Sequence, residues 1–284
     1  MRSLKIVFVC GAVMVLGTPE ASSQAWPQAR GAGYYQVGFQ VVRATEFYEP
    51  GGNILDIPTL SDYLFSFYGE RGITDRLTVQ AYIPLVERIT LNKVVGEETG
   101  FEFFEGDAVT GLADADIGLR YGFWSKGSAV ASAILRFGIP LGQDSQENGL
   151  QTGDGELNQY LGLAYGYSFW PRPAYFIVDA GFNNRVNDYS DELLYKVEAG
   201  HGIGSSFTII GRVRGVASFR NGVDERLGGT GGLYGNNQRY TAFGAELAYS
   251  PSGVYGISIR GEGAAFAENI LAAPAFGVSL FMKR

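Results

Sequence analysis

The chain has 284 residues and a formal net charge of −7, with 41 glycines, 14% aromatic residues and only 18% charged residues. An acidic chain without clustered lysine and arginine lacks the basic surface that binds nucleic acid, so we expect no nucleic-acid partner. Beyond the N-terminus, no stretch reaches the roughly 18 consecutive apolar residues of a transmembrane helix, which excludes a membrane protein built from helices.

The N-terminus has the layout of a secretory signal peptide. Arg2 and Lys5 precede an apolar run over 6–16, and the small residues ASSQA follow at 21–25. A basic start, a short apolar run and small residues before the cleavage point are the three parts of such a peptide. The run is too short to cross a bilayer as a helix, so we leave it out of the folded domain.

We expect cleavage after Ser23 or Ala25. The chain then divides into a signal peptide over 1–25 and a single domain over 26–284. The one cysteine, Cys10, is removed with the signal peptide. The domain therefore has no disulfide, metal thiolate or thiol nucleophile available to it.

The rest of the chain alternates between apolar and polar residues. In 113–123 (ADADIGLRYGF), for example, Asp116 and Arg120 alternate with Ile117 and Leu119. A period of two predicts β-strands with two chemically different faces. Most segments are about ten residues long, which is the length that a tilted strand needs to cross the hydrocarbon layer. Twelve segments have this pattern: 34–43, 60–68, 76–88, 113–123, 129–141, 157–169, 174–185, 192–201, 207–219, 239–249, 254–263 and 274–282.

The connections between these segments alternate between short and long. The short ones are 69–75, 124–127, 170–173, 202–206 and 250–253. The long ones are 44–59, 89–112, 142–156, 220–238 and 264–273, with a shorter one at 186–191. A soluble β-sandwich has no reason to sort its loops by length. Outer-membrane barrels do so, with short turns in the periplasm and long loops outside.

The faces of the strands indicate which side meets lipid. In 76–86 the apolar set is Leu77, Val79, Ala81, Ile83 and Leu85, and the other face carries Thr78, Gln80 and Tyr82. A charge on the lipid face would cost roughly 2–4 kcal/mol at the middle of the bilayer, so the polar face must be the enclosed one. Aromatic residues gather near the short turns, as in an interfacial girdle: Phe123, Trp124, Phe169, Trp170, Tyr175, Tyr249 and Tyr255. We predict an all-β, closed antiparallel transmembrane barrel of about twelve strands in the outer membrane.

Several segments resemble a family of outer-membrane channel proteins of the phenol meta-pathway degradation type. They are YGERGITDRLTVQAYIPL (68–85), GLADADIGLRYGF (111–123), LRFGIPLG (135–142), TGDGELNQYLGLAYGYSF (152–169) and NNRVNDYSDE (183–192). The resemblance implies a small outer-membrane barrel that passes small organic molecules. One departure is the C-terminus, where Phe281 is followed by three more residues although such barrels often end on an aromatic residue.

The enclosed face carries most of the candidate site residues. They are Gln80, Tyr82, Asp114, Asp116, Arg120, Arg136, Asp179, Arg185, Lys196, Glu198, Arg212, Arg214, Glu246, Arg260 and Glu262. In one interpretation they form a charged constriction that selects permeants by size and charge. In the other they form a network of buried salt bridges that fills a narrow interior. Both signs of charge are present, so strong ion selectivity is not indicated.

The leading functional hypothesis is a passive channel or facilitator for small, aromatic or apolar solutes. The alternative is a structural or adhesive surface barrel with a plugged lumen, and a segment such as 26–30 inside the lumen would indicate gated passage. A third candidate, an outer-membrane lipase, would need a serine beside the only histidine, His201, and no serine is placed for that role by the sequence. We expect no enzyme, no catalytic residue and no cofactor.

The predicted partners are outer-membrane lipid, lipopolysaccharide and a small solute. The sequence does not indicate the oligomeric state. Acidic residues at 97–107 and 152–156 could bind calcium or bridge to lipopolysaccharide, but solvated loop acids are the simpler interpretation, and we predict no metal site. GGTGGLYGNN (228–237) lacks the lysine and the following helix of a phosphate-binding loop and is predicted to be a flexible surface loop.

Overall fold

The computed structural model describes residues 25–96, 99–145, 148–223 and 234–284, so residues 1–24 of the predicted signal peptide lie outside these ranges. The regular structure in the described ranges consists of strands. None of their segments is a helix with the length and hydropathy of a membrane span.

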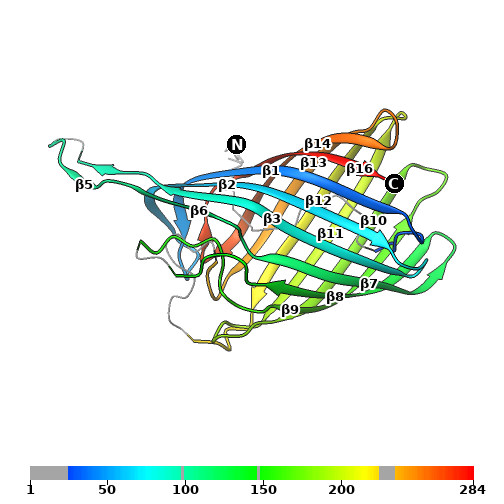
Figure 1. The fold of residues 1–284 in the computed structure, drawn as a ribbon, viewed down its shortest axis with the longest axis horizontal. Coiled ribbons are helices and arrows are strands. Elements are labelled where there is room, and N and C mark those ends of the chain that lie inside the picture. The colour runs from blue at the N-terminus through cyan, green and yellow to red at the C-terminus, as the bar shows by residue number, and fades with distance from the viewer. Residues whose placement is uncertain (1–24, 97–98, 146–147, 224–233) are drawn as a thin grey trace, which may run out of the picture.

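Twelve of the described strands form the wall of a closed antiparallel barrel (Figure 1). They are β1 (Gly33–Tyr48), β2 (Ile54–Gly72), β3 (Leu77–Leu91), β7 (Ala115–Lys126), β8 (Ala129–Ile139), β9 (Gln159–Ser168), β10 (Ala174–Asn184), β11 (Glu192–Ile203), β12 (Phe207–Ser218), β13 (Arg239–Tyr249), β14 (Tyr255–Glu268) and β16 (Ala275–Lys283). The sheet closes at β1, where Gln40 lies opposite Leu64 of β2 and Gly277 of β16. Closure leaves no unpaired edge, which hydrocarbon requires of a strand structure.

The barrel has a short-turn end and a long-loop end. At the long-loop end, β4 (Val94–Val95) and β5 (Glu102–Phe104) form a projecting hairpin, β6 (Asp107–Gly111) pairs with β3, and β15 (Ile270–Leu271) pairs with β1 (Figure 1).

Two of the predicted long loops are mostly strand. The predicted loop 44–59 shrinks to 49–53, because β1 and β2 stay paired as far as Tyr48 and Ile54. The predicted loop 264–273 is largely occupied by the end of β14 and by β15. The strands therefore continue past the length that a membrane span needs, because their inward residues still pack against other parts of the interior.

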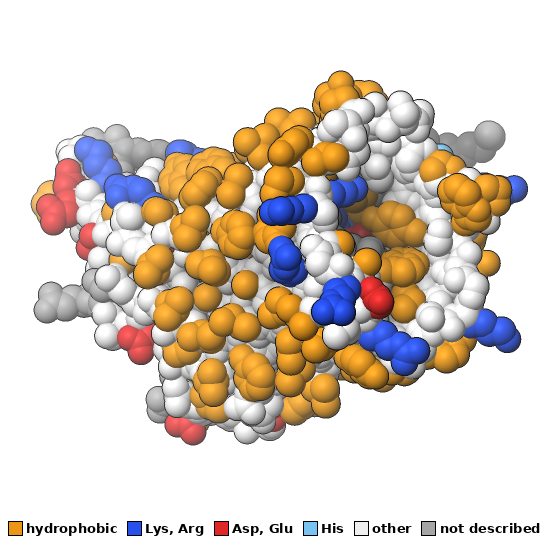
Figure 2. Space-filling model, turned by 45° about the vertical axis from the view of Figure 1, so that its right-hand side comes forward, with side chains coloured by type: hydrophobic (Ala, Val, Ile, Leu, Met, Phe, Trp, Pro, Cys, Tyr) orange, Lys and Arg blue, Asp and Glu red, His pale blue; other side chains and the backbone are white. Residues whose placement is uncertain are grey.

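The outer and inner faces have opposite chemistry. Leu119 is 42% exposed on the outside, whereas its neighbour Arg120 is fully buried inside. Large apolar side chains cover much of the outer surface (Figure 2). Five of the exposed ones are Phe65, Leu161, Leu163, Val197 and Ile259. This inversion of a soluble protein is the arrangement of a barrel in lipid.

The aromatic residues near the short turns face outward with one exception. Trp124, Phe169, Trp170 and Tyr255 are exposed on the outside. Tyr175, predicted as a girdle residue, instead points into the barrel and donates a hydrogen bond to Glu198 at 2.8 Å. Its position in β10 gives it the inward parity of Ile177 and Asp179, and parity outweighs closeness to the turn.

Candidate functional site

A cavity of about 280 Å³ lies inside the barrel. Its lining comes from β2, β3, β7 to β13 and β15, and from the loops that carry Asp154 and Tyr234. Six tyrosines belong to the lining: Tyr68, Tyr82, Tyr160, Tyr195, Tyr234 and Tyr240. Four basic and six acidic side chains complete its charged part: Arg136, Arg185, Lys196, Arg214, Glu87, Asp114, Asp116, Asp154, Asp179 and Glu192. The cavity is therefore aromatic, polar and richer in acids than in bases.

The N-terminal segment, residues 25–32, enters the lumen at the short-turn end. The carbonyl of Ala25 accepts a hydrogen bond from Ser132 Oγ at 2.6 Å, and the carbonyl of Trp26 accepts one from Arg120 Nη1 at 2.7 Å. The Gln28 backbone amide donates to Thr78 Oγ1 at 2.8 Å. These partners lie on β8, β7 and β3, which are neighbouring strands, so the segment lies inside the barrel against this part of the wall.

Inward-facing glycines make room for this segment. A Cβ atom at Gly122 would come within 2.6 Å of Pro27, and one at Gly166 within 2.6 Å of the Trp26 ring. The Trp26 ring also packs edge-on against Tyr175, with centroids 6.3 Å apart. The wall is therefore shaped to accept residues 25–28.

Buried ion pairs fill the interior beside this segment. Arg120 Nη2 lies 2.9 Å from Glu70 Oε2, and both side chains are fully buried. Arg212 bridges Glu198 at 2.8 Å and Glu246 at 2.7 Å. The charges lie on facing or neighbouring strands, so the barrel register holds each guanidinium against its carboxylate.

Weaker ion pairs lie around the cavity. Lys196 Nζ is 3.4 Å from Asp179, directly opposite it on β10. Arg136 is 3.8 Å from Asp116, and its guanidinium lies over the Tyr160 ring at 4.8 Å. The distances within these two ion pairs are longer than those within the ion pairs at the short-turn end.

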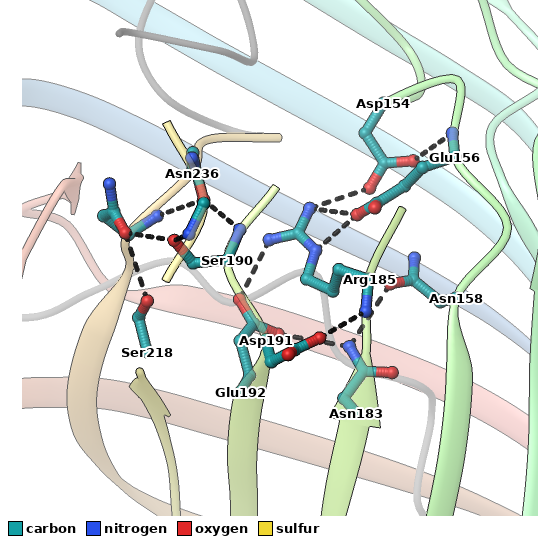
Figure 3. Close-up of polar contacts among 12 residues, drawn as sticks. Asp154, Glu156, Asn158, Asn183, Arg185, Ser190, Asp191, Glu192, Ser218 and Asn236 are labelled. Atoms are coloured by element: carbon teal, nitrogen blue, oxygen red, sulfur yellow. Dashed lines mark hydrogen bonds and ion pairs between the residues drawn. The ribbon is translucent and has the colours of Figure 1, made fainter. Parts of the chain in front are cut away.

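Arg185 organises the long-loop end (Figure 3). Its guanidinium contacts Asp154 at 3.2 Å, Glu192 at 2.9 Å and also Glu156, and its plane stacks on the Tyr189 ring at 4.2 Å. Two loop carboxylates and Glu192 at the start of β11 converge on this one cation, so it ties the loop before β9 to the loop after β10.

Asp114 performs a similar role through backbone groups. Its carboxylate accepts hydrogen bonds from the amides of Leu141 at 3.0 Å, Gly142 at 2.8 Å and Asp154 at 2.8 Å. Burial and the charge of Asp154 raise the pKa of the Asp114 carboxyl to about 7, although the hydrogen bonds oppose this. Asp114 therefore anchors the loop 140–158 besides facing the cavity.

An apolar cluster, which we call the roof, closes the long-loop end. It consists of Val42, Ala44, Phe47, Leu60, Ile89, Val109, Leu150, Tyr234, Leu271, Ala273 and Ala275. Inward residues of the extended strands supply most of it, and Leu150 and Tyr234 come from loops. The inner face of the barrel is therefore polar at the short-turn end and in the middle, but apolar at the long-loop end.

All fifteen candidate site residues point into the interior. Nine line the cavity: Gln80, Tyr82, Asp114, Asp116, Arg136, Asp179, Arg185, Lys196 and Arg214. The other six are engaged in contacts of the interior: Arg120, Glu198, Arg212, Glu246, Arg260 and Glu262. Most of them form ion pairs with one another, Arg214 with Glu262 among them.

Sequence reasoning missed several interior groups. Glu87 was missed because β3 has a bulge between Pro84 and Val86, which changes the alternation. Proline cannot donate to a neighbouring strand and is common at such irregularities. Glu70 was missed because it belongs to the stretch 69–75, predicted as a turn, whereas β2 runs to Gly72.

Two predictions about the long loops were wrong. The acids at 152–156 are neither solvated nor arranged for calcium, because Glu156 is buried and both it and Asp154 bind Arg185. Within the described ranges, no group of three or more His, Cys, Asp or Glu residues is placed to hold a metal. Of the predicted surface loop 228–237, residues 228–233 lie outside the described ranges, and Tyr234 is buried in the roof.

Comparisons with known proteins bear on the fold. No protein-family model matches the sequence, and no curated protein is similar to it. An outer membrane channel from Pseudomonas putida F1 has a TM-score of 0.72 and 13% identity, over 93% of this chain and 99% of that one. The translocator domain of the autotransporter NalP from Neisseria meningitidis has a TM-score of 0.50 and 9% identity, over 90% of this chain and 88% of that one. The first likeness, together with the closed sheet, establishes that this chain has the fold of a small outer-membrane β-barrel.

Proposed function

We propose that the protein is an outer-membrane channel or facilitator through which small solutes pass passively. The observation that carries the proposal is a cavity of about 280 Å³ inside a barrel whose outer face is apolar. A cavity with a few polar groups among aromatic walls is typical of sites for small molecules. In this proposal the long-loop end faces the cell exterior, and the short-turn end and both termini lie in the periplasm.

The proposal extends to the kind of solute and to the route of export. Six tyrosines in the cavity favour solutes with an aromatic or apolar part, in line with the resemblance to the phenol meta-pathway type. A signal peptide that ends at 23 or 25 would deliver the chain to the periplasm. Burial of Ala25 and its bond to Ser132 support cleavage after Ser23, which keeps Ala25 in the mature chain.

A plugged surface barrel is the second candidate, and one observation favours it. Residues 25–28 lie inside the lumen at the short-turn end and are held by hydrogen bonds and by the close fit at Gly122 and Gly166. We propose that this segment is a removable plug, because residues 25–28 pair with no described strand and the segment joins the sheet only at the bridge of Arg30 and the start of β1.

The experiment is liposome swelling with a series of neutral solutes of increasing size. The protein and a variant whose mature chain lacks residues 24–29 are compared. We expect slow flux of the smallest solutes through the whole chain and faster, less size-limited flux through the variant. Absence of flux from both proteins would overturn the channel in favour of the structural barrel.

An enzymatic role has no observation in its favour. His201 is exposed on the outer face of β11, between Ala174 and Ile209 of the neighbouring strands. Neither neighbour offers a hydroxyl, so the serine–histidine pair of a lipase does not form through the strand register there. We therefore propose a non-enzymatic membrane protein whose partners are lipid, lipopolysaccharide and its solute.

A further inference from the structure

Two carboxylates in the barrel have no cation. Asp62 on β2 and Glu87 on β3 are both fully buried. Six lumen bases have carboxylates within ion-pair distance: Arg120, Arg136, Arg185, Lys196, Arg212 and Arg214. Among the described residues, neither Asp62 nor Glu87 forms an ion pair with any base. Asp114 also has no base within ion-pair distance among the described residues, but it accepts three backbone amide hydrogen bonds, which Asp62 and Glu87 do not.

The strand register brings the two carboxyl groups together. Asp62 lies opposite Ile89 and Glu87 lies opposite Leu64, so the two acids are diagonal neighbours on the inner face, within hydrogen-bonding reach of each other. Glu87 Oε2 accepts a hydrogen bond from the Tyr234 hydroxyl at 2.5 Å. Glu87 Oε1 and both oxygens of Asp62 have no donor among the described residues.

The apolar surroundings of Asp62 and Glu87 make it energetically costly to ionise both carboxyl groups without a positive charge nearby. The pair sits beneath the apolar roof, in contact with residues such as Leu60 and Ile89 of the same strands. Two adjacent carboxylates in apolar surroundings cannot both be ionised unless a cation lies beside them, and without a cation they share a proton. Apart from the hydrogen bond that the two carboxyl groups share, the described residues offer no donor to Glu87 Oε1 or to either oxygen of Asp62.

Glu87 faces the cavity, and Asp62, its diagonal neighbour on β2, does not itself belong to the lining. Glu87 belongs to the lining of the 280 Å³ cavity, together with the rings of Tyr68, Tyr82 and Tyr234. Aromatic faces attract cations, most strongly where water is excluded. The lining also has more acids than bases, so its average charge favours a cation over an anion.

We propose that the cavity binds a small organic cation, an amine of about the size of one substituted ring, with Glu87 and Asp62 as its counter-ions. The tyrosine rings contact the apolar body and the charged nitrogen. An inorganic cation is less well served, because no third carboxylate or histidine among the described residues joins the pair to complete a metal site. The inference deepens the proposed channel by naming a substrate class.

The test is calorimetric titration of the purified full-length protein in detergent with three ligands of matched shape. They are 2-phenylethylamine, which is cationic, 2-phenylethanol, which is neutral, and phenylacetate, which is anionic. We expect the amine to bind at least about tenfold more tightly than the other two, which corresponds to about 1.4 kcal/mol. Equal affinity for the three ligands overturns the proposal, and so does binding of calcium chloride alone with no binding of the amine.

The double substitution Asp62→Asn/Glu87→Gln preserves shape while it removes the charge. We expect it to abolish the preference for the amine and to leave the affinity for the alcohol unchanged. The matched control is Glu102→Gln/Asp107→Asn, which removes the same charge from the exposed β5 and β6 strands and should leave amine binding intact. An amine preference that survives in the Asp62→Asn/Glu87→Gln variant overturns the assignment.

The calorimetric titration tests the cation site, and the liposome experiment tests the channel, so either proposal can be overturned without the other. Amine binding without any liposome flux would overturn the channel but keep the cation site. Flux of neutral solutes without amine preference would overturn the cation site but keep the channel.

Discussion

The two ends of the barrel are closed by different chemistry. At the short-turn end, the interior is filled by ion pairs fixed across neighbouring strands, such as Glu198 with Arg212, and by residues 25–28. At the long-loop end, closure comes from the apolar roof and from loop residues such as Leu150 and Tyr234. Tyr234 reaches Glu87 across 147 residues of sequence.

The difference lies in what holds each closure in place. Partners on adjacent strands cannot separate unless the sheet itself breaks, so the ion pairs of the short-turn end are part of the wall. The N-terminal segment there is held by a few hydrogen bonds and by shape. At the long-loop end, several loops must keep their contacts at once, with Arg185 and Asp114 as the ties. We therefore expect the short-turn end to open by release of one segment and the long-loop end by rearrangement of several loops.

The largest effect should come from Gly166→Leu. A leucine side chain would occupy the space of the Trp26 ring and the Ala25 methyl, so residues 25–28 could not seat in the lumen. We expect a several-fold increase in single-channel conductance in planar bilayers, because the narrowest part of the route is then wider. Gly211→Leu is the matched control, since a side chain at Gly211 on β12 meets nothing within 4 Å. Equal conductance of both variants and the parent would show that the segment does not limit passage.

The next effect concerns the ion pairs of the same end. Arg120→Met leaves the carboxylate of Glu70 buried without its cation, and a buried pair broken in this way costs about 3–5 kcal/mol. The free energy of unfolding in urea, measured in detergent micelles, should fall by about that amount. The double variant Arg120→Met/Glu70→Gln should recover most of the loss, because no uncompensated charge remains. Equal losses in the single and the double variant would contradict a role for the charge.

The sequence could predict the wall of the barrel but not the residues that close its two ends. Within the strands that cross the membrane, alternation decides which side faces lipid, and it places Arg120, Lys196 and Arg212 inside because the alternative is a charge in hydrocarbon. The partners of Lys196 and Arg212 then follow from strand register, whereas Glu70, the partner of Arg120, lies two strands away on β2. The wall and its charged face were therefore predictable.

The closures themselves could not be read in this way. Glu87 follows a bulge at Pro84, and alternation cannot predict on which residue a bulge falls. Contacts of Asp154 and Glu156 with Arg185 depend on how two loops approach each other, which no period encodes. One signal was available for the N-terminal segment, namely glycines such as Gly122 and Gly166 at inward positions of strands, where a missing side chain leaves space for another backbone.

A smaller effect should be a loss of stability with rising pH that is confined to the long-loop end, where Asp114 lies. The pKa of Asp114 is raised to about 7 by burial and by Asp154, so the folded protein holds a proton there that the unfolded chain releases near pH 4. The stability from this group is complete below its ordinary pKa and is lost as the pH rises through about 7. The loss is up to about 1.4 kcal/mol per pH unit between about pH 4 and about pH 7.

Two measurements check this pH dependence. The free energy of unfolding of the parent should fall between about pH 4 and about pH 7, and Asp114→Asn should flatten the curve. Hydrogen exchange should locate the loosening at the amides of Leu141 and Gly142, which Asp114 holds. An increase in stability over this range, or loosening confined to the short-turn end, would refute the role of Asp114.

The smallest effect is expected at His201. The comparison of this residue with Tyr175 tests whether the face of the strand, inward or outward, decides the role of a side chain near the short turns. His201 and Gly200 are adjacent in β11, and their partners on β10 are Ala174 and Tyr175. His201 faces outward, whereas the inward Tyr175 contacts Trp26 and donates to Glu198. Tyr175→Ala should therefore loosen the N-terminal segment and raise conductance, while His201→Ala should change neither conductance nor thermal stability. Phospholipid hydrolysis that is present in the parent and lost in His201→Ala would contradict this assignment, because the outer face near the short turns would then carry chemistry as well as lipid contacts.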